Sequence, residues 1–543
     1  MVRLVKNRGW TQKQQRAETK QLTHKATLSQ PGSRTKQDKC LPLADAIDEQ
    51  HHHEVASFHT PGHKGISPFE GAEKAWQLDI TELPGLDELS NPSGLLKSLE
   101  KSASRVWGSR TSLISVNGAS AALSAAILAC ANRGKRILLP RNVHRSAIHA
   151  LVLSGLEPVW YDPCFDKEWS TWTNVPTTSV EHQLQKFDSD LACVVVVSPT
   201  YTGCSSDVQA LSTAAHSHGI PLIVDEAHGA HRIANSSMPP SAVTQGADAV
   251  VHSLHKTLSA LTQTGILHLS QHSLIDDSLA RAALNLLQSS SPSYLLMTSI
   301  EHCIAQLEVN DSAIKAMQNR CTRFAKRLSA MNGVKLFAPA FDAAEPTHFL
   351  MRLAGATGAE LADRCASRGI YAEAVFGGAV LFLAGIGTTE EDFENLLVVL
   401  HDVHQESVQQ PWNGGSTCSS GTKALPRVSG STGKALPNNS RQAGFDDHSN
   451  GTISSDQSAD DYLAALPFCF GEQVLTPRVA FFSAVETVSF EQSIGRIAAD
   501  CIAPCPPGTP VVVPGQRITH EVASVCRRPL YRVVVESSIQ GEQ

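Results

Sequence analysis

Short runs of β-branched residues alternate with Ala- and Leu-rich stretches of helical length between about residues 111 and 270. This alternation predicts an α/β fold built on a mostly parallel sheet, because parallel neighbours need a crossover connection that is usually a helix. The run from Cys193 to Val197 (CVVVV) has no polar alternation, so we expect that strand to be buried on both faces. Seven strands are predicted, beginning near Leu113, Arg136, Pro158, Cys193, Pro221, Ala249 and Gly265.

The rest of the chain divides by composition and periodicity. At 543 residues it exceeds what one hydrophobic core normally serves, so several domains are expected. An amphipathic stretch, IKAMQNRCTRFAKRLSAM, opens a region of mixed strands and helices, and a later Gly-, Ser-, Asn- and Thr-rich region predicts a disordered linker. The predicted parts are an N-terminal arm at 41–110, a large α/β domain at 111–310, a small α+β domain at 311–405, the linker at 406–460 and a C-terminal domain at 461–543. Within the last of these we expect a helix of ordinary length from Leu475, a Pro-rich turn and a final β-like stretch.

The first 40 residues differ in charge from all that follows. They hold ten Lys or Arg but only two acidic residues, Glu18 and Asp38, so +8 lies on this segment and −15 on the remainder of a chain whose net charge is −7. This asymmetry favours an organelle transit segment, plastid before mitochondrion, over a disordered basic tail on a cytoplasmic protein. No apolar stretch follows the charges, which argues against a secretory signal.

Composition also excludes several classes of function. The net charge of −7 gives no basic excess that would favour binding of nucleic acid. The chain contains no apolar run of 18 residues, so no membrane span is predicted. The thirteen cysteines are scattered without a CxxC pair, and we interpret even the close pair Cys501 and Cys505 as reduced structural thiols. The cluster His51, His52 and His53 lacks the spacing of a metal site, so no metal is predicted.

Two predicted strands end in residues suited to holding a cofactor. The strand of VHSLHKTLSALTQT ends at Ser253, His255 and Lys256, and the strand of PLIVDEAHGAH ends at Asp225. Ligands of open α/β sheets bind at such carboxyl ends, where a carboxylate can pair with a protonated pyridine nitrogen. A lysine there is by itself more often a solvated surface residue. The alternative of a nucleotide-hydrolysing helicase box at Asp225 fails, because the chain contains no GxxxxGK[ST] loop.

Two further segments supply what a phosphorylated planar cofactor needs. In ISVNGASAALSAAILACA, Gly118, Ala119 and Ser120 lie between a strand and an Ala-rich helix, where free N–H groups and the helix dipole attract phosphate. In LPRNVHRSAIHA, His144 follows a strand and offers a ring for stacking and for proton transfer. Each feature alone is more often structural, but their order along the chain supports a single site.

Together these strings resemble the Orn/Lys/Arg decarboxylases of the aspartate-aminotransferase fold, fold type I. The string SLHKTLSALTQT resembles the family's pyridoxal-phosphate attachment site. Other stretches that resemble the family are FHTPGHKG, ELPGLDELSNP, SPTYTG, VDEAHGAH, SSPSY, LFLAGIGTTEEDFENL and PPGTPVVVPGQRIT. The resemblance spans about residues 41–405 and 465–525.

The resemblance implies a role for each candidate residue. Lys256 would carry pyridoxal 5'-phosphate as a Schiff base, Asp225 would hold the pyridinium and His144 would stack on the ring. Ser120, Ser253 and His255 would hold the phosphate, with Gly118 and Ala119 in its cradle, and His228 would contact the ring face or its hydroxyl. The expected reaction is decarboxylation of lysine, ornithine or arginine to the amine for polyamine synthesis, with Lys256 or His144 returning the proton to Cα. Enzymes of this fold usually work as dimers, so Ser291 and Tyr294 of SSPSY are expected near a neighbouring subunit's cofactor.

Departures from the family pattern leave alternatives open. Cys505 stands where the family usually has the Tyr of Tyr-Pro-Pro-Gly, and Gln516 where it has the Glu of Pro-Gly-Glu. Both lie in the C-terminal domain, so they bear on the substrate more than on the cofactor. The first alternative is an aminotransferase or another enzyme with this cofactor, which would grip the substrate carboxylate with an arginine such as Arg352. The second is a non-catalytic regulator that keeps the fold.

Overall fold

The computed structural model describes residues 41–53, 56–187, 190–234, 238–309, 312–339, 344–376, 378–409, 471–503, 508–525 and 530–535. The predicted transit segment at 1–40, nearly all of the predicted linker at 406–460, and Cys505 lie outside the described residues. The described residues from Leu41 onward belong to one compact unit. The boundaries proposed between the parts of this unit therefore stay predictions.

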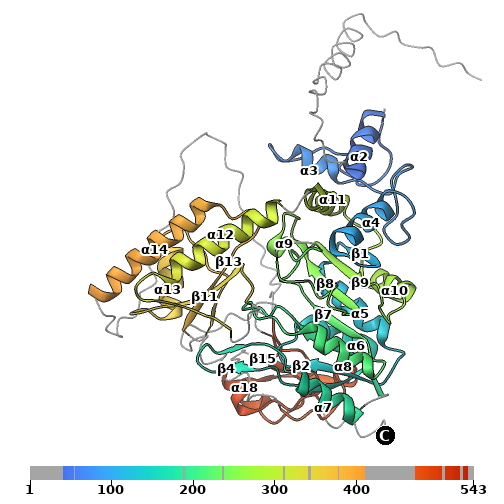
Figure 1. Ribbon diagram of the computed structural model, residues 1–543. Coiled ribbons are helices and arrows are strands. Elements are labelled where there is room, and N and C mark those ends of the chain that lie inside the picture. The colour runs from blue at the N-terminus through green and yellow to red at the C-terminus, as the bar shows by residue number, and fades with distance from the viewer. Residues whose placement is uncertain are drawn as a thin grey trace, which may run out of the picture. The chain divides into compact units, whose positions relative to one another are not determined.

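A seven-stranded sheet forms the centre of the large domain (Figure 1). Its strand order is β1-β9-β8-β7-β6-β2-β3, and neighbours are parallel except that β9 runs antiparallel to both β1 and β8. Each strand begins within two residues of its predicted start, which confirms the mostly parallel α/β sheet. The strands are β1 (Thr111–Ser115), β2 (Arg136–Pro140), β3 (Glu157–Tyr161), β6 (Leu191–Val197), β7 (Leu222–Asp225), β8 (Ala249–Ser253) and β9 (Gly265–Leu269).

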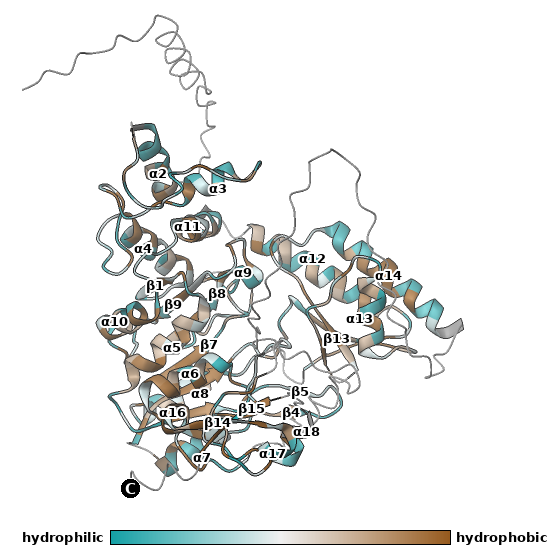
Figure 2. Ribbon diagram, turned by 180° about the vertical axis from the view of Figure 1, so that it is seen from behind, coloured by the Kyte–Doolittle hydropathy of each residue, from teal (hydrophilic) through white to brown (hydrophobic). Residues whose placement is uncertain are grey.

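Helices cover both faces of this sheet because its strands are apolar on both faces. In β6, Cys193 and Val195 pack into one hydrophobic core, while Val194 and Val196 pack into another on the opposite face. Figure 2 shows β7 and the neighbouring helix α5 as mainly hydrophobic. The first face is covered by α5 (Gly118–Cys130), α6 (Arg145–Ser154) and α10 (Asp277–Leu287), and the second by α7 (Thr177–Phe187) and α8 (Val208–Ser217).

The N-terminal arm packs against the large domain through helices. Leu96 and Trp107 of α4 (Leu95–Trp107) are fully buried, in the same core as Leu43 of α2 (Pro42–His53) and Met297 of α11 (Tyr294–Val309). The short helix α3 (Glu73–Leu78) also contacts α11. The arm is thus part of the folded unit rather than a separate domain.

The small α+β region opens with the predicted amphipathic helix, α12 (Ser312–Ser329), whose Met317 and Phe324 are buried. Figure 1 shows α12 and α14 beside the small sheet that follows. That sheet is antiparallel, in the order β10-β11-β13-β12. Its elements are β10 (Val334–Leu336), β11 (His348–Leu353), α13 (Gly358–Ala366), β12 (Ala374–Phe376), β13 (Ala379–Leu383) and α14 (Glu390–Gln409). Helix α14 continues past residue 406, where the linker was expected to begin.

The prediction of a helix of ordinary length from Leu475 is wrong. Only α16 (Pro477–Phe482) is helical there, and the chain then forms β14 (Val485–Ser489) and the short α17 (Phe490–Ser493). Strand β14 pairs antiparallel with β15 (Leu530–Val534), which is the predicted final β-like stretch. This pairing with a distant strand overrides the local helical pattern. The helix α18 (His520–Val525) and a two-stranded hairpin in the large domain, β4 (Phe165–Asp166) with β5 (Thr171–Trp172), complete the fold.

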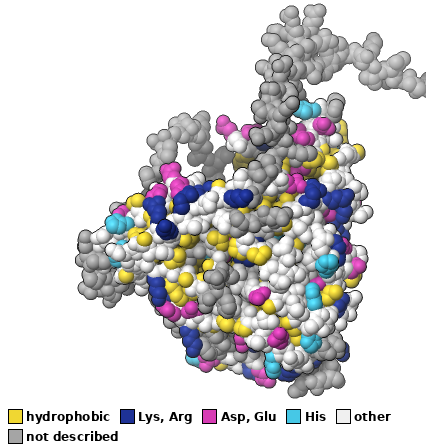
Figure 3. All heavy atoms as spheres, in the orientation of Figure 1, with side chains coloured by type: hydrophobic (Ala, Val, Ile, Leu, Met, Phe, Trp, Pro, Cys, Tyr) yellow, Lys and Arg dark blue, Asp and Glu magenta, His cyan; other side chains and the backbone are white. Residues whose placement is uncertain are grey.

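The surface charge is mixed. Acidic and basic side chains are both scattered over the face shown in Figure 3. Within the part of the chain that the structure describes, no helix is long and apolar enough to cross a membrane.

Candidate active site

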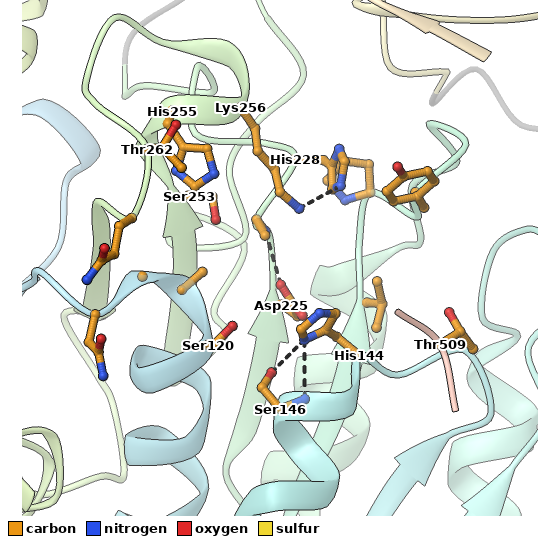
Figure 4. A pocket seen from close by; sticks show the side chains of 18 of the residues that line it. Ser120, His144, Ser146, Asp225, His228, Ser253, His255, Lys256, Thr262 and Thr509 are labelled. Atoms are coloured by element: carbon orange, nitrogen blue, oxygen red, sulfur yellow. Dashed lines mark hydrogen bonds between the residues drawn. The ribbon is translucent and has the colours of Figure 1, made fainter. Parts of the chain in front are cut away.

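A cavity of about 350 Å³ lies where three central strands end. Val197, Asp225 and Ser253 are the last residues of β6, β7 and β8, and all three line it. This is the position at which open α/β sheets bind ligands. The structure brings all the predicted site residues together in the cavity wall, several of them labelled in Figure 4: Gly118, Ala119, Ser120, His144, Asp225, His228, Ser253, His255 and Lys256.

Lys256 enters the cavity from α9 (Leu254–Thr257), a single helical turn directly after β8. Its Nζ lies 2.9 Å from Nε2 of His228 (Figure 4). Burial lowers the pKa of His228 well below its usual range, and the nearby positive charge of Lys256 lowers it further. His228 is therefore neutral, and a neutral ring nitrogen can accept a hydrogen bond from the Lys256 ammonium.

Asp225 presents a buried carboxylate to the same cavity. Its side chain is 7% exposed and accepts a hydrogen bond from the backbone N–H of Ala227 at 3.2 Å. Burial raises its pKa, and the charge of Lys256 only partly offsets this. Among the described residues Asp225 has no ion-pair partner within salt-bridge distance, so a cation bound in the cavity would stabilise its charged form.

The part of the cavity wall at the start of α5 is suited to an anion. Helix α5 begins at the cavity, and its N-cap residue Asn117 makes no side-chain capping bond. Gly118 has a φ of +74°, and a Cβ on Gly265 of the adjacent β9 would lie 2.7 Å from the nitrogen of Ala119, so this turn packs closely only because Gly265 lacks a side chain. Ser253 makes no side-chain capping bond to α9 either. Backbone N–H groups and hydroxyls at a helix N-terminus suit a phosphate.

His144 is held as the N-cap of α6. Its Nδ1 accepts a hydrogen bond from the backbone N–H of Ser146 at 3.2 Å, so Nε2 carries the proton of the neutral ring. Burial, followed by the charge of Lys256, lowers the pKa of His144 to about 4. Gly508 of the C-terminal region lies against the ring, because a Cβ there would be 3.0 Å from its Cδ2 and Nε2.

Sequence reasoning did not assign several residues of the cavity wall. Tyr201 lies with its ring centre 5.0 Å from that of His228, and Thr262 and Thr509 reach the cavity from loops. All three fall in strings that resemble the family, SPTYTG, HKTLSALTQT and PPGTP, but the pattern of a loop does not say which side chain faces inward. The remaining unassigned lining residues are Asn117, Asn142, Ser146, Val197, Pro199, Ala227 and Gln263.

Other singled-out residues lie elsewhere. Tyr294 is fully buried, and its hydroxyl donates a hydrogen bond to the carbonyl of Asp87 in the same chain. The side chain that was expected near a neighbouring subunit's cofactor is therefore already bonded within its own subunit. Ser291 is exposed, and its role between subunits stays a prediction. Arg352 stacks on Trp169, with 4.9 Å from its Cζ to the ring centre, and is absent from the cavity wall.

Gln516, His51 and Cys501 also lie apart from the cavity wall. Gln516 is buried and its Oε1 accepts from the backbone N–H of Val513 at 3.0 Å, so it serves a turn. His51 is bonded to the carbonyl of Gln77, and no group of three or more His, Cys, Asp or Glu side chains within the described ranges is placed to hold a metal ion. Cys501 is half-buried and, like the other cysteines that the structure describes, forms no disulfide.

Comparison with known proteins identifies the family. The model of the Orn/Lys/Arg decarboxylase major domain matches residues 41–350, and that of the family's C-terminal domain matches residues 467–528. The chain belongs to the Orn/Lys/Arg decarboxylase family. Membership makes it an enzyme of pyridoxal-phosphate-dependent decarboxylation of basic amino acids, and Asp225, Lys256 and the N-terminus of α5 provide the charges that this cofactor requires.

Relatives and solved structures agree with this assignment. The uncharacterized protein YaaO of Bacillus subtilis is 32% identical over 92% of this chain and 96% of its own. An arginine decarboxylase of Bacillus anthracis is 28% identical over 90% of this chain and 93% of its own. Lysine decarboxylase A from Pseudomonas aeruginosa matches in structure with a TM-score of 0.71 at 19% identity, over 94% of this chain and 77% of its own. The fold is therefore that of the family, α/β fold type I.

Proposed function

We propose that this enzyme decarboxylates arginine to agmatine, with pyridoxal phosphate attached to Lys256. Four relatives named arginine decarboxylases are 26–28% identical over 87–90% of this chain and 91–96% of their own. Two relatives named lysine decarboxylases, and one named a biodegradative arginine decarboxylase, are 22–24% identical and match over only 40–74% of their own length. Arginine is thus the first substrate to test, with lysine and ornithine as the alternatives.

The observation that carries the proposal is that one cavity holds both a lysine amine and a buried carboxylate. Among the described residues this carboxylate has no ion-pair partner within salt-bridge distance. Lys256 would bind the cofactor, Asp225 would hold its ring nitrogen, and Ser120, Ser253 and His255 would hold its phosphate against the start of α5. When bound, the cofactor supplies an electron sink for the bond to the departing carboxylate. None of the described residues that line the cavity is an arginine, which disfavours an aminotransferase that grips the substrate carboxylate through Arg352.

His144 and Lys256 are the two candidates for returning a proton to Cα. His144 is neutral at physiological pH, because its pKa is lowered to about 4, and its proton sits on Nε2. A neutral imidazole is a much weaker acid than an ammonium, so Lys256 is the better donor and His144 the better stacking partner of the ring. The Nδ1 bond to Ser146 fixes the orientation of the ring, so the proton is held at one place. The Tyr201 ring beside His228 narrows the cavity and would help to exclude water.

The wider roles stay proposals. An agmatine product would supply polyamine synthesis. The enzyme would act as a homodimer or higher homo-oligomer, and the basic segment at 1–40 would direct it to a plastid rather than a mitochondrion, the cytoplasm being the alternative.

Borohydride reduction followed by peptide mapping tests the cofactor assignment. In the full-length protein loaded with pyridoxal phosphate, the reduced cofactor should be found on Lys256, and Lys256→Ala should remove it. Lys101→Ala, at an exposed position of α4, should leave the labelled peptide unchanged. Labelling of a different lysine in the wild-type protein would refute the proposal.

A further inference from the structure

A chain of hydrogen bonds leads from Lys256 out of the cavity to the small antiparallel sheet. While Nε2 of His228 faces Lys256, its Nδ1 lies 3.2 Å from Nε2 of His348. His348 is the first residue of β11 and does not line the cavity. A residue of the cavity wall therefore contacts the small antiparallel sheet next to Lys256.

The chain continues to a carboxylate. Nδ1 of His348 lies 3.0 Å from Oγ1 of Thr347, and that hydroxyl donates to Oε1 of Glu345 at 3.2 Å. Glu345 and Thr347 are 2% and 1% exposed, so solvent does not compete for these bonds. The path thus runs from the amine through two imidazoles and a hydroxyl to Glu345.

Glu345 is the fixed end of this path. Its Oε2 accepts from the Arg232 guanidinium at 2.7 Å and 3.0 Å, and its Oε1 is 2.7 Å from Nε2 of His231. Burial alone would raise the pKa of Glu345, but His231 and Arg232 hold it well below its usual range. Glu345 is therefore ionised and can only accept hydrogen bonds.

An acceptor at one end sets the direction of every bond before it. Because the Thr347 hydroxyl donates to Glu345, its oxygen accepts from His348, whose proton must then be on Nδ1. His348 is left with an unprotonated Nε2, which accepts from Nδ1–H of His228. His228 in turn has a free lone pair on Nε2, facing Lys256. The reverse direction would require the single Thr347 proton to serve both His348 and Glu345.

Both rings are neutral, as this chain of bonds requires. Burial lowers the pKa of His348 to about 3, although Glu345 opposes the shift. The other charged or titratable groups that act on it are His231, Arg232 and Lys256, and those that act on His228 are Lys256, His348, His144 and His231. Among these groups Glu345 is the one anion, so it can orient the chain.

We infer that His348 is a positioning residue that fixes the tautomer of His228, so that Nε2 of His228 accepts a hydrogen bond from the amine of Lys256. The inference rests on the proposed role of Lys256. It means that the small antiparallel sheet sets the protonation behaviour of the cofactor-binding lysine, through a side chain that does not line the cavity.

The rate at which pyridoxal phosphate attaches to Lys256 tests the inference. Full-length protein is stripped of cofactor, pyridoxal phosphate is added back, and the rate of attachment is followed by absorbance across a range of pH. Only the unprotonated amine attacks, so the midpoint of this profile reports the ionisation of Lys256. His348→Leu should lower the midpoint by about one pH unit, because His228 then accepts less well from the ammonium. His348→Gln, whose Oε1 replaces the accepting Nε2, should restore the wild-type midpoint.

Two results would overturn the inference: an unchanged midpoint in folded His348→Leu protein, or an equal shift in His348→Gln. If His348→Leu does not fold, Thr347→Val replaces it, with Thr347→Ser as its matched control. Thr347→Val should shift the midpoint downward and Thr347→Ser should not; an unchanged midpoint in Thr347→Val would overturn the inference.

Nitrogen NMR separates this inference from the proposed function. In cofactor-free protein with ¹⁵N-labelled histidine, His228 should carry its proton on Nδ1 in the wild type and lose this preference in His348→Leu. A proton on Nε2 of wild-type His228 would overturn the inference even if the cofactor attaches to Lys256. Failure of the cofactor to attach to Lys256, with His228 in the expected tautomer, would refute the proposed function alone.

Discussion

Replacing Asp225 with Asn should have opposite effects on cofactor affinity and on the stability of the cofactor-free protein. The Asp225 carboxylate is 7% exposed and has no cationic partner within salt-bridge distance among the described residues, so burial raises its pKa. A carboxyl whose pKa is raised in the folded protein costs stability as pH rises above its ordinary value of 3.8. The nearly isosteric amide removes this cost and keeps an acceptor for the N–H of Ala227. We therefore expect a higher free energy of unfolding at pH 7, with the gain fading as pH falls toward 4.

Cofactor affinity should move the other way. Removing one partner of a buried, hydrogen-bonded charge pair costs about 2–5 kcal/mol, which corresponds to a loss of roughly 30-fold to several thousand-fold in affinity. Urea unfolding of the cofactor-free protein and fluorescence titration with pyridoxal phosphate measure the two effects.

Asp248→Asn is the matched control for Asp225→Asn. Asp248 is fully buried just before β8, at the end of the sheet away from the cavity, and it accepts from the backbone N–H groups of Leu222 at 2.7 Å and Leu274 at 2.6 Å. Its replacement should destabilise the protein and leave cofactor affinity unchanged. Unaltered cofactor affinity in Asp225→Asn, or a loss of stability like that of the control, would refute the assignment of Asp225.

Three other substitutions test separate parts of the structure. Gly508→Ala should weaken cofactor binding about tenfold in a fluorescence titration, because its Cβ would lie 3.0 Å from the His144 ring; Gly495→Ala, which has a similar φ of +80° but no neighbour within 4 Å, should leave binding unchanged. His144→Asn should make the cofactor-free protein less sensitive to acid. In the folded protein the pKa of His144 is lowered from 6.5 to about 4, so the unfolded chain takes up a proton first as the pH falls. The free energy of unfolding of the wild-type protein should therefore fall by roughly 3 kcal/mol between pH 6.5 and pH 4. Equal pH dependence of the urea midpoints of wild type and His144→Asn would contradict this. Thr357→Ala breaks the capping box of α13 and should cost about 1 kcal/mol of stability without changing turnover, whereas Thr357→Ser should cost little; an unaltered urea midpoint in Thr357→Ala would show that the cap does not matter.

The sequence predicted the central sheet well because its signal is local. Strands such as β6 are short, apolar and bounded by turns, and the predicted site residues follow directly from where these strands end. The carboxyl ends of parallel strands meet at one edge, so Asp225 and Lys256 had to lie near each other once the sheet was predicted. The predicted phosphate cradle at Ser120 likewise depended only on a strand, a turn and a helix in sequence.

What the sequence did not predict depends on contacts between distant segments. The region after Leu475 has helical periodicity, but β14 pairs with β15 more than 40 residues later and forms a strand. Thr509 reaches the cavity because the C-terminal region packs on α6, where Arg478 donates to the carbonyl of Leu153 at 2.8 Å. The chain of hydrogen bonds from Lys256 to Glu345 joins the cavity to the small antiparallel sheet, and no local pattern marks His348 as its middle member.

The decisive measurement is release of CO2 from arginine by the purified full-length protein, with added pyridoxal phosphate and no keto acid. Lysine and ornithine are offered in parallel, and Lys256→Ala serves as the inactive control. The wild-type protein should form CO2 and agmatine from arginine, and Lys256→Ala should form neither. Release from lysine or ornithine alone would overturn the proposed substrate. Silence with all three, in protein that carries the cofactor on Lys256, would contradict the decarboxylase itself.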